Sequence, residues 1–153
     1  MTAAIEVDVD SLGSITTDVW TSFVAEDAVV LPLDDVPLHA LTDVSSRVVI
    51  EGDASGCVVV RCDPSSAAAL ARRLFRLGDS VEPDDEDVAD ALGEMANIVG
   101  GNVKSLGLGD SRLTLPAVGA SGEVENGDRL VCAADVIWED GRAILFVGLP
   151  YQP

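Results

Sequence analysis

A long amphipathic pattern between Val88 and Leu106 constrains the fold more than any other feature of the chain. Apolar side chains recur there at helical spacing and fall within roughly 80° of Met95 on a helical projection. They are Val88, Ala91, Leu92, Val99, Val103 and Leu106. Asp90, Glu94, Asn97 and Gly101 cluster on a different side. The pattern therefore predicts a helix with one face in a core and a polar face outside it.

Two pairs of β-rich segments are predicted to form hairpins. Arg47–Glu51 and Cys57–Cys62 are joined by a five-residue segment rich in Gly, Asp and Ser. Leu130–Trp138 and Ala143–Leu149 flank a Glu-Asp-Gly-Arg segment, in which Asp-Gly is a strong signal for a tight turn. Both pairs therefore indicate antiparallel strands.

The remaining segments predict further helices and strands. We expect a strand near Ile5–Val9, a helix over Ser14–Ala28, a helix from Asp63-Pro64 to near Gly78, an acidic linker over Asp79–Asp87 and a strand over Arg112–Val118. Ser14 is the expected N-cap of the first helix, with Trp20 at the edge of its apolar side. Pro116 implies an edge or irregular position in the last strand. This order predicts an α+β fold, a two-layer sandwich with a mainly antiparallel sheet packed against long helices, in a single domain over residues 1–153.

The charge balance narrows the classes of partner. The chain has 153 residues, a formal net charge of -18 and only nine Lys plus Arg. So few cations argue against binding nucleic acid through its phosphates, and they disfavour anionic membranes as well. The sequence shows no apolar run of 18 residues and no signal-peptide pattern, so we expect a cytoplasmic protein.

Reactive side chains are scarce. His39 is the only histidine, which excludes a multi-histidine metal site and leaves any Ser-His-Asp triad dependent on a residue in a Pro-rich loop. Cys57, Cys62 and Cys132 have no Cys-x-x-Cys spacing, and the first two flank an apolar run, which favours structural, reduced thiols. We expect no metal and no cofactor of the chain's own.

The polar face of the predicted helix carries the candidate chemistry. Glu94 and Asn97 are three residues apart, so both side chains project from one helical face about one turn apart. Gly93 and Gly100 lie in the same helix, where each costs about 1 kcal/mol relative to Ala, and close approach by another backbone would explain them. A second Glu-x-x-Asn spans Glu123 to Asn126, but it precedes Gly127 in a loop-like segment and is read as accidental.

The context of the first pair resembles a known family. Asp-x-x-x-Glu-x-x-Asn over Asp90 to Asn97, followed by Gly101-Asn102 and later by Leu-Pro-Ala-Val at 115–118, is similar to the CheC/CheX/FliY family of chemotaxis phosphatases. A single motif looks most like CheX, because CheC-type relatives carry two motifs on pseudo-symmetric helices and Ser14–Ala28 has none. The order of the predicted elements also fits a CheX-like domain.

The resemblance implies a function and a partner. The substrate would be the phosphoaspartate of a CheY-like receiver protein, with Mg²⁺ supplied by the receiver. Asn97 would orient the attacking water, and Glu94 would engage the receiver's active-site lysine. Asp90, Gly93 and Gly101 would contact the partner, and a homodimer is plausible. From its position near the apolar side of the helix, Asn102 is expected to be a buried hydrogen-bonding residue. Lys104, the only lysine, is expected to lie on the surface beside a charge partner, with contact to an acidic receiver as the alternative.

Two other functions remain open from the sequence. The chain could be a non-catalytic CheX-like module that binds a receiver or another signalling protein. It could also be an acidic oligomerisation domain in which the Glu94 and Asn97 spacing is accidental. The presence of both residues favours the phosphatase.

Overall fold

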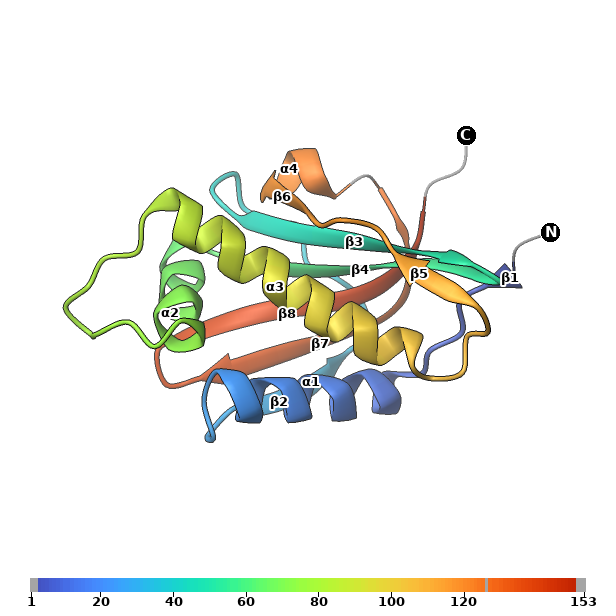
Figure 1. The fold of residues 1–153 in the computed structure, drawn as a ribbon, viewed down its shortest axis with the longest axis horizontal. Coiled ribbons are helices and arrows are strands. Elements are labelled where there is room, and N and C mark those ends of the chain that lie inside the picture. The colour runs from blue at the N-terminus through green and yellow to red at the C-terminus, as the bar shows by residue number, and fades with distance from the viewer. Residues whose placement is uncertain (1–2, 126, 151–153) are drawn as a thin grey trace.

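A computed structural model describes residues 3–125 and 127–150. These residues form a layer of helices packed against one β-sheet, whose strands differ in length (Figure 1). The helices are α1 (Val9–Phe23), α2 (Pro64–Leu74), α3 (Asp85–Lys104) and α4 (Ser121–Val124). The strands are β1 (Ala3–Ala4), β2 (Val29–Leu33), β3 (Val44–Gly52), β4 (Ala54–Cys62), β5 (Ser111–Leu113), β6 (Ala117–Ala120), β7 (Arg129–Trp138) and β8 (Gly141–Leu149). The expected α+β fold is confirmed.

The sheet is antiparallel except for the two-residue strand β1. Its strand order is β2-β7-β8-β4-β3-β5, with β6 also paired to β3 and β1 paired in parallel to β4. Both predicted hairpins form, as β3–β4 and β7–β8. The first turn is tighter than expected, since Asp53 alone separates its strands, and Gly52 takes the positive φ (137°) that this reversal needs.

The main core lies between the sheet and α1, α2 and α3. Figure 1 shows α3 lying across the sheet, with α1 near the edge formed by β2. Alternate residues of the inner strands, among them Val48, Val58 and Leu145, share one buried cluster with Leu92 and Met95 of α3. A smaller cluster of Val59, Ala133 and Phe146 forms on the opposite face of the sheet.

The N-terminal predictions were partly wrong. The expected strand at Ile5–Val9 is absent, and α1 begins at Val9 because Asp8 caps it, accepting a hydrogen bond from the Ser11 amide at 2.7 Å. Ser14 therefore lies inside the helix. Trp20 is fully buried instead of lying at the edge, with its ring centroid 6.1 Å from that of Trp138.

Proline and helix-end positions explain other differences. Pro32 lies in an unexpected strand, β2, which tolerates it because it pairs on one side only, with β7. The expected strand at Arg112–Val118 is split into β5 and β6, with Pro116 between them. The helix α2 ends at Leu74 rather than near Gly78, because Arg76 adopts the left-handed region (φ 53°) that usually favours glycine.

The predicted amphipathic helix is α3, and its start is well specified. Asp84 accepts from the Asp87 amide while Asp87 accepts from the Asp84 amide, a reciprocal capping box. The helix buries its apolar stripe from Ala91 to Val103, including Leu92 and Met95, and Val88 is partly buried. Leu106 lies beyond its end and is 44% exposed. No helix among the described residues is long and apolar enough to cross a membrane.

Replacing either of the two adjacent glycines of α3 by alanine is expected to have opposite effects on stability. A Cβ on Gly100 would lie 2.8 Å from Cγ2 of Val48, which is fully buried, whereas a Cβ on Gly101 would meet nothing within 4 Å. We expect Gly101→Ala to raise the free energy of unfolding by about 0.5–1 kcal/mol through helix propensity. Gly100→Ala should lower it by about 1 kcal/mol or more, because overpacking exceeds that gain. Urea denaturation measures both, and equal shifts would contradict the assignment.

Candidate functional site

A shallow groove runs along the polar face of α3. Its volume is about 500 Å³, and it is open to solvent. The wall from α3 is formed by Ala89, Asp90, Gly93, Glu94 and Asn97. Pro116, Val118 and Phe75 complete the lining from the segment around the start of β6 and from the end of α2. Four of the five predicted site residues therefore lie together, and three further residues come from elements distant in sequence.

The side chains in this groove differ in exposure. Glu94 and Asp90 are exposed, and Asn97 is half-buried. Among the described residues, neither the Asn97 carboxamide nor the Glu94 carboxylate has a hydrogen-bond or ion-pair partner within the protein, so both are available to a ligand. Gly101, the fifth predicted residue, lies one turn beyond Asn97 and does not line the groove.

Gly93 is explained by the close approach of two side chains. A Cβ at this position would lie 3.2 Å from Cγ of Pro116 and 3.6 Å from Cγ2 of Val118. Gly100 is likewise approached by the side chains of Val48 and Leu113. The expectation that another backbone would approach was therefore wrong in its detail. The absence of a side chain at Gly93 keeps the floor of the groove low between Glu94 and Pro116.

Two polar residues near the end of α3 do not join the groove. Asn102 is exposed, and its Nδ2 donates to the Ile98 carbonyl at 2.8 Å. The prediction that it is buried was wrong, because it falls at the margin of the apolar stripe where the last helical turn meets solvent. Lys104 is half-buried at the end of the helix, and no carboxylate of the described residues lies within ion-pair distance of it.

The second Glu-x-x-Asn has a different setting. Glu123 is exposed on α4, a single turn of helix beside β3 and β6. Asn126 lies outside the described residues. Neither Glu123 nor its neighbours line the α3 groove.

The thiols have the properties of structural residues. Burial raises the pKa of Cys57 to about 12 and that of Cys132 to about 11, and it raises the pKa of Cys62 as well. The thiols therefore stay protonated and unreactive at neutral pH. In the parts of the chain described, no three His, Cys, Asp or Glu side chains are placed to hold a metal ion.

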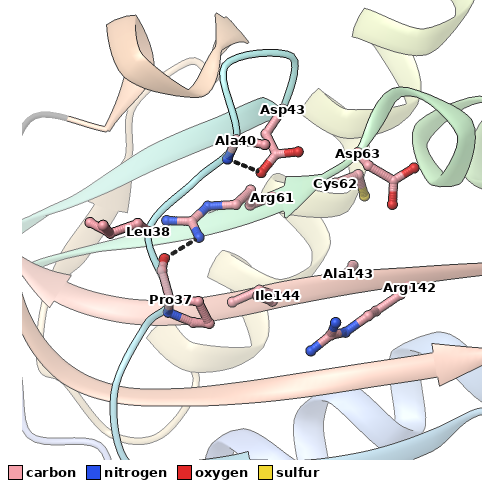
Figure 2. Close-up of a pocket in the computed structure, with 10 residues that line it drawn as sticks. All are labelled: Pro37, Leu38, Ala40, Asp43, Arg61, Cys62, Asp63, Arg142, Ala143 and Ile144. Carbon is pink, nitrogen blue, oxygen red and sulfur yellow. Dashed lines mark hydrogen bonds between the residues drawn. The ribbon is translucent and has the colours of Figure 1, made fainter.

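The opposite face of the sheet has a polar pocket that was not predicted from the sequence. A segment that we call the strap, residues 34–43, crosses this face of the sheet. Figure 2 shows Arg61 pointing from β4 toward the strap. Arg61 Nη1 donates to the Pro37 carbonyl at 2.6 Å, and its Nε and Nη2 donate to Glu125. Arg142, at the other end of the pocket, is paired with Asp135 at 2.8 Å. Both guanidinium groups are already paired with groups of the protein itself, so we interpret the pocket as structural.

An arginine within the apolar run at 57–62, in β4, could have indicated this network. Alternation places Arg61 on the face opposite Val60 and Cys62, and a buried cation requires an anionic partner. That partner, Glu125, is 64 residues away in sequence, so its identity depends on the fold.

Comparison with known proteins identifies the family. A family model described as chemotaxis phosphatase CheX matches residues 44–132. The chemotaxis protein CheX from Vibrio vulnificus superposes with a TM-score of 0.71 at 17% identity, over 93% of this chain and 98% of the other. A chain of the CheX-CheY-BeF3-Mg²⁺ complex from Borrelia burgdorferi gives 0.72 at 20% identity, over 95% and 100%.

More distant relatives share the fold as well. FliY from Thermotoga maritima gives a TM-score of 0.59 at 14% identity, over 90% of this chain and 84% of the other. No curated protein matches the sequence. Because the family model covers more than half of the chain, including the whole of α3, the chain belongs to the CheX family of chemotaxis phosphatases.

Proposed function

We propose that this protein hydrolyses the phosphoaspartate of a CheY-like receiver, with the α3 groove as its active site. The observation that carries the proposal is the pair of side chains on the open wall of that groove, Glu94 and Asn97, which have no partner among the residues that the structure describes. A relative from Borrelia burgdorferi forms a CheX-CheY-BeF3-Mg²⁺ complex. A shallow, open groove suits the surface of a protein better than a small metabolite, which is usually enclosed on most sides.

Asn97 is the group that orients the attacking water. A carboxamide offers both a donor and an acceptor and does not ionise near neutral pH, so it holds a water for in-line attack without placing negative charge beside the phosphoryl group. Its half-buried position limits the directions in which the amide can point. Hydrolysis of this kind requires no covalent intermediate on the phosphatase, and Mg²⁺ belongs to the receiver.

Glu94 is the group that fixes the docking register. Its exposed carboxylate projects one turn before Asn97, where it can form a charge-assisted hydrogen bond with a lysine of the receiver. Asp90 adds a second carboxylate a turn earlier. Gly93 and Pro116 form the low floor of the groove beside these carboxylates, and the receiver approaches over this floor.

Reversing the charge at Glu94 should weaken docking. We expect Glu94→Lys to raise the Kd for a BeF3-loaded receiver at least tenfold, because a lysine would face the receiver's lysine where a carboxylate had been. Glu94→Ala should have a smaller effect of the same sign. The matched control is Glu123→Lys, an identical charge change at an exposed position of α4. Equal losses for both lysine variants would show that net charge, not this contact, controls binding.

Phosphate release tests the proposed reaction. The protein is mixed with a panel of receivers phosphorylated by a small phosphodonor, and the loss of phosphoaspartate is compared with that of each receiver alone and with the Asn97→Ala variant present. Accelerated release that depends on Asn97 is expected. Binding without accelerated release would favour the non-catalytic receiver-binding module, and neither binding nor release would overturn the proposal.

A further inference from the structure

A segment of the first helix resembles the groove helix in sequence. Asp-Ser-Leu-Gly-Ser-Ile-Thr-Thr at 10–17 matches Asp-Ala-Leu-Gly-Glu-Met-Ala-Asn at 90–97, with identical Asp, Leu and Gly in the same order. Leu12 and Leu92 are both fully buried, so the two segments present the same face to the core. Each helix is also followed by a Leu-Pro pair, at 31–32 and at 115–116.

The sheet repeats in the same way. Exchanging β2 with β6, β7 with β3 and β8 with β4 converts the order β2-β7-β8-β4-β3-β6 into itself read backwards. The residue after each proline pairs with the neighbouring strand: Leu33 with Ala133 of β7, and Ala117 with Arg47 of β3. Each half of the chain therefore contributes a helix, an edge strand and a hairpin, related by an approximate two-fold axis between β4 and β8.

The repeat extends to the surface. A groove of about 520 Å³ lies between α1 and β2, close to the volume of about 500 Å³ in the α3 groove. Six of its eight lining residues occupy positions equivalent to α3-groove residues. In the order of the α3 groove (Ala89, Asp90, Gly93, Glu94, Asn97, Pro116), they are Val9, Asp10, Gly13, Ser14, Thr17 and Pro32.

The α1 groove keeps the size and the acidic lining of the other groove but not its reactive groups. Asp10 and Asp18 supply two carboxylates, the same number that Asp90 and Glu94 supply in the α3 groove, although only Asp10 lies at an equivalent position and Ser14 replaces Glu94. A Cβ on Gly13 would meet nothing within 4 Å, so its floor is open. Thr17 replaces Asn97, and its hydroxyl donates to the Gly13 carbonyl of its own helix at 2.8 Å. That hydroxyl proton is not available to position a water.

We propose that the α1 groove is a second docking surface for a phosphorylated receiver, which it binds without hydrolysing. The proposal rests on the proposed function of the α3 groove and extends it to a partner of the same class. An acidic groove of similar size, with Asp, Gly and Pro at equivalent positions, fits the same kind of surface, and its two carboxylates, Asp10 and Asp18, are the groups that attract the receiver's lysine. One chain would then hold two receivers and dephosphorylate one of them.

Binding stoichiometry tests this proposal. The probe is a CheY-like receiver that the protein dephosphorylates, loaded with BeF3 and Mg²⁺ and titrated into the full chain by calorimetry and by sedimentation. We expect two receivers per chain. Ser14→Lys and Glu94→Lys, both at exposed helix positions, should each reduce the number to one, and the combined variant should bind none.

The alternatives give different results. One receiver per wild-type chain, lost in Glu94→Lys and unchanged in Ser14→Lys, would overturn the second surface while leaving the proposed function intact. Self-association of the chain alone that Ser14→Lys abolishes would assign the α1 groove to a second copy and would also overturn it. Absence of both binding and hydrolysis with the receiver panel would instead refute the function of the α3 groove.

Discussion

Asn97→Ala is expected to lower the rate of phosphoaspartate hydrolysis by about 10²- to 10³-fold, or roughly 3–4 kcal/mol, which is the usual cost of removing one preorganised polar group from an active site. The variant should remain folded, because Asn97 is half-buried on the polar face of α3 and the core face is formed by other residues. The reduction should appear in kcat more than in receiver affinity, since the carboxamide acts on the water. Single-turnover release of phosphate, with circular dichroism to verify folding, measures the effect.

Asn102→Ala is the matched control for this prediction. It removes the same carboxamide from the same helix, at an exposed position where the side chain donates only to the Ile98 carbonyl. We expect its hydrolysis rate to stay within about twofold of the wild type, in line with the small effects of surface changes. A loss in Asn102→Ala equal to that in Asn97→Ala would contradict the role of Asn97, as would full activity in Asn97→Ala.

Local sequence patterns were sufficient to predict those elements in which hydrophobic periodicity, capping residues and turn residues all indicated the same structure. The helix α3 combines an apolar stripe, an acidic capping box and a basic residue in its last turn. The β7–β8 hairpin has the Asp140-Gly141 turn between two long β-rich runs. The predicted site residues Asp90, Gly93, Glu94 and Asn97 are all on one helix, so helical spacing alone places them side by side.

The features that sequence reasoning missed depend on tertiary contacts. Pro32 lies in a strand because β2 needs only one neighbour, and no local pattern reveals that it is at the edge. Phe75 and Pro116 reach the α3 groove from α2 and from the start of β6, and only the packing of those elements brings them there. For α1, Ser14 was the expected N-cap, but the structure uses the earlier residue Asp8.

The cluster around Arg61 is the second feature with a large expected effect. The side chains of Arg61 and Glu125 are only 6% and 11% exposed, and their guanidinium and carboxylate form two hydrogen bonds, of 2.9 and 2.5 Å. Ser45 also donates to Glu125, at 2.6 Å, and Arg61 ties down the strap through the Pro37 carbonyl. The pair thus joins β3, β4, the strap and the segment after α4.

Removing one member of this pair leaves the other charge buried. We expect Arg61→Ala to lower the free energy of unfolding by about 3–5 kcal/mol, the usual cost of an uncompensated buried ion. The control is Arg112→Ala, which breaks a pair with Glu51 in which the side chains are 81% and 46% exposed; it should cost about 1 kcal/mol or less. Urea denaturation at pH 7 measures both. Replacing Arg61 and Glu125 together with methionine should cost less than Arg61→Ala.

The pH dependence gives an independent test of the same pair. Desolvation alone would raise the pKa of Glu125, but the hydrogen bonds from Arg61 and Ser45 outweigh it, so the pKa is lowered from its ordinary value of 4.5. A carboxylate whose pKa is lower in the folded state contributes stability above its unfolded pKa and loses that contribution as the pH falls through the folded value. The stability difference between wild type and Arg61→Ala should therefore be full at neutral pH and shrink as the pH falls through the range in which Glu125 becomes protonated, first in the variant, where Arg61 no longer opposes desolvation, and then in the wild type. A difference that stays constant from pH 7 to pH 3 would show that Arg61 stabilises the fold by packing and not through the charge of Glu125.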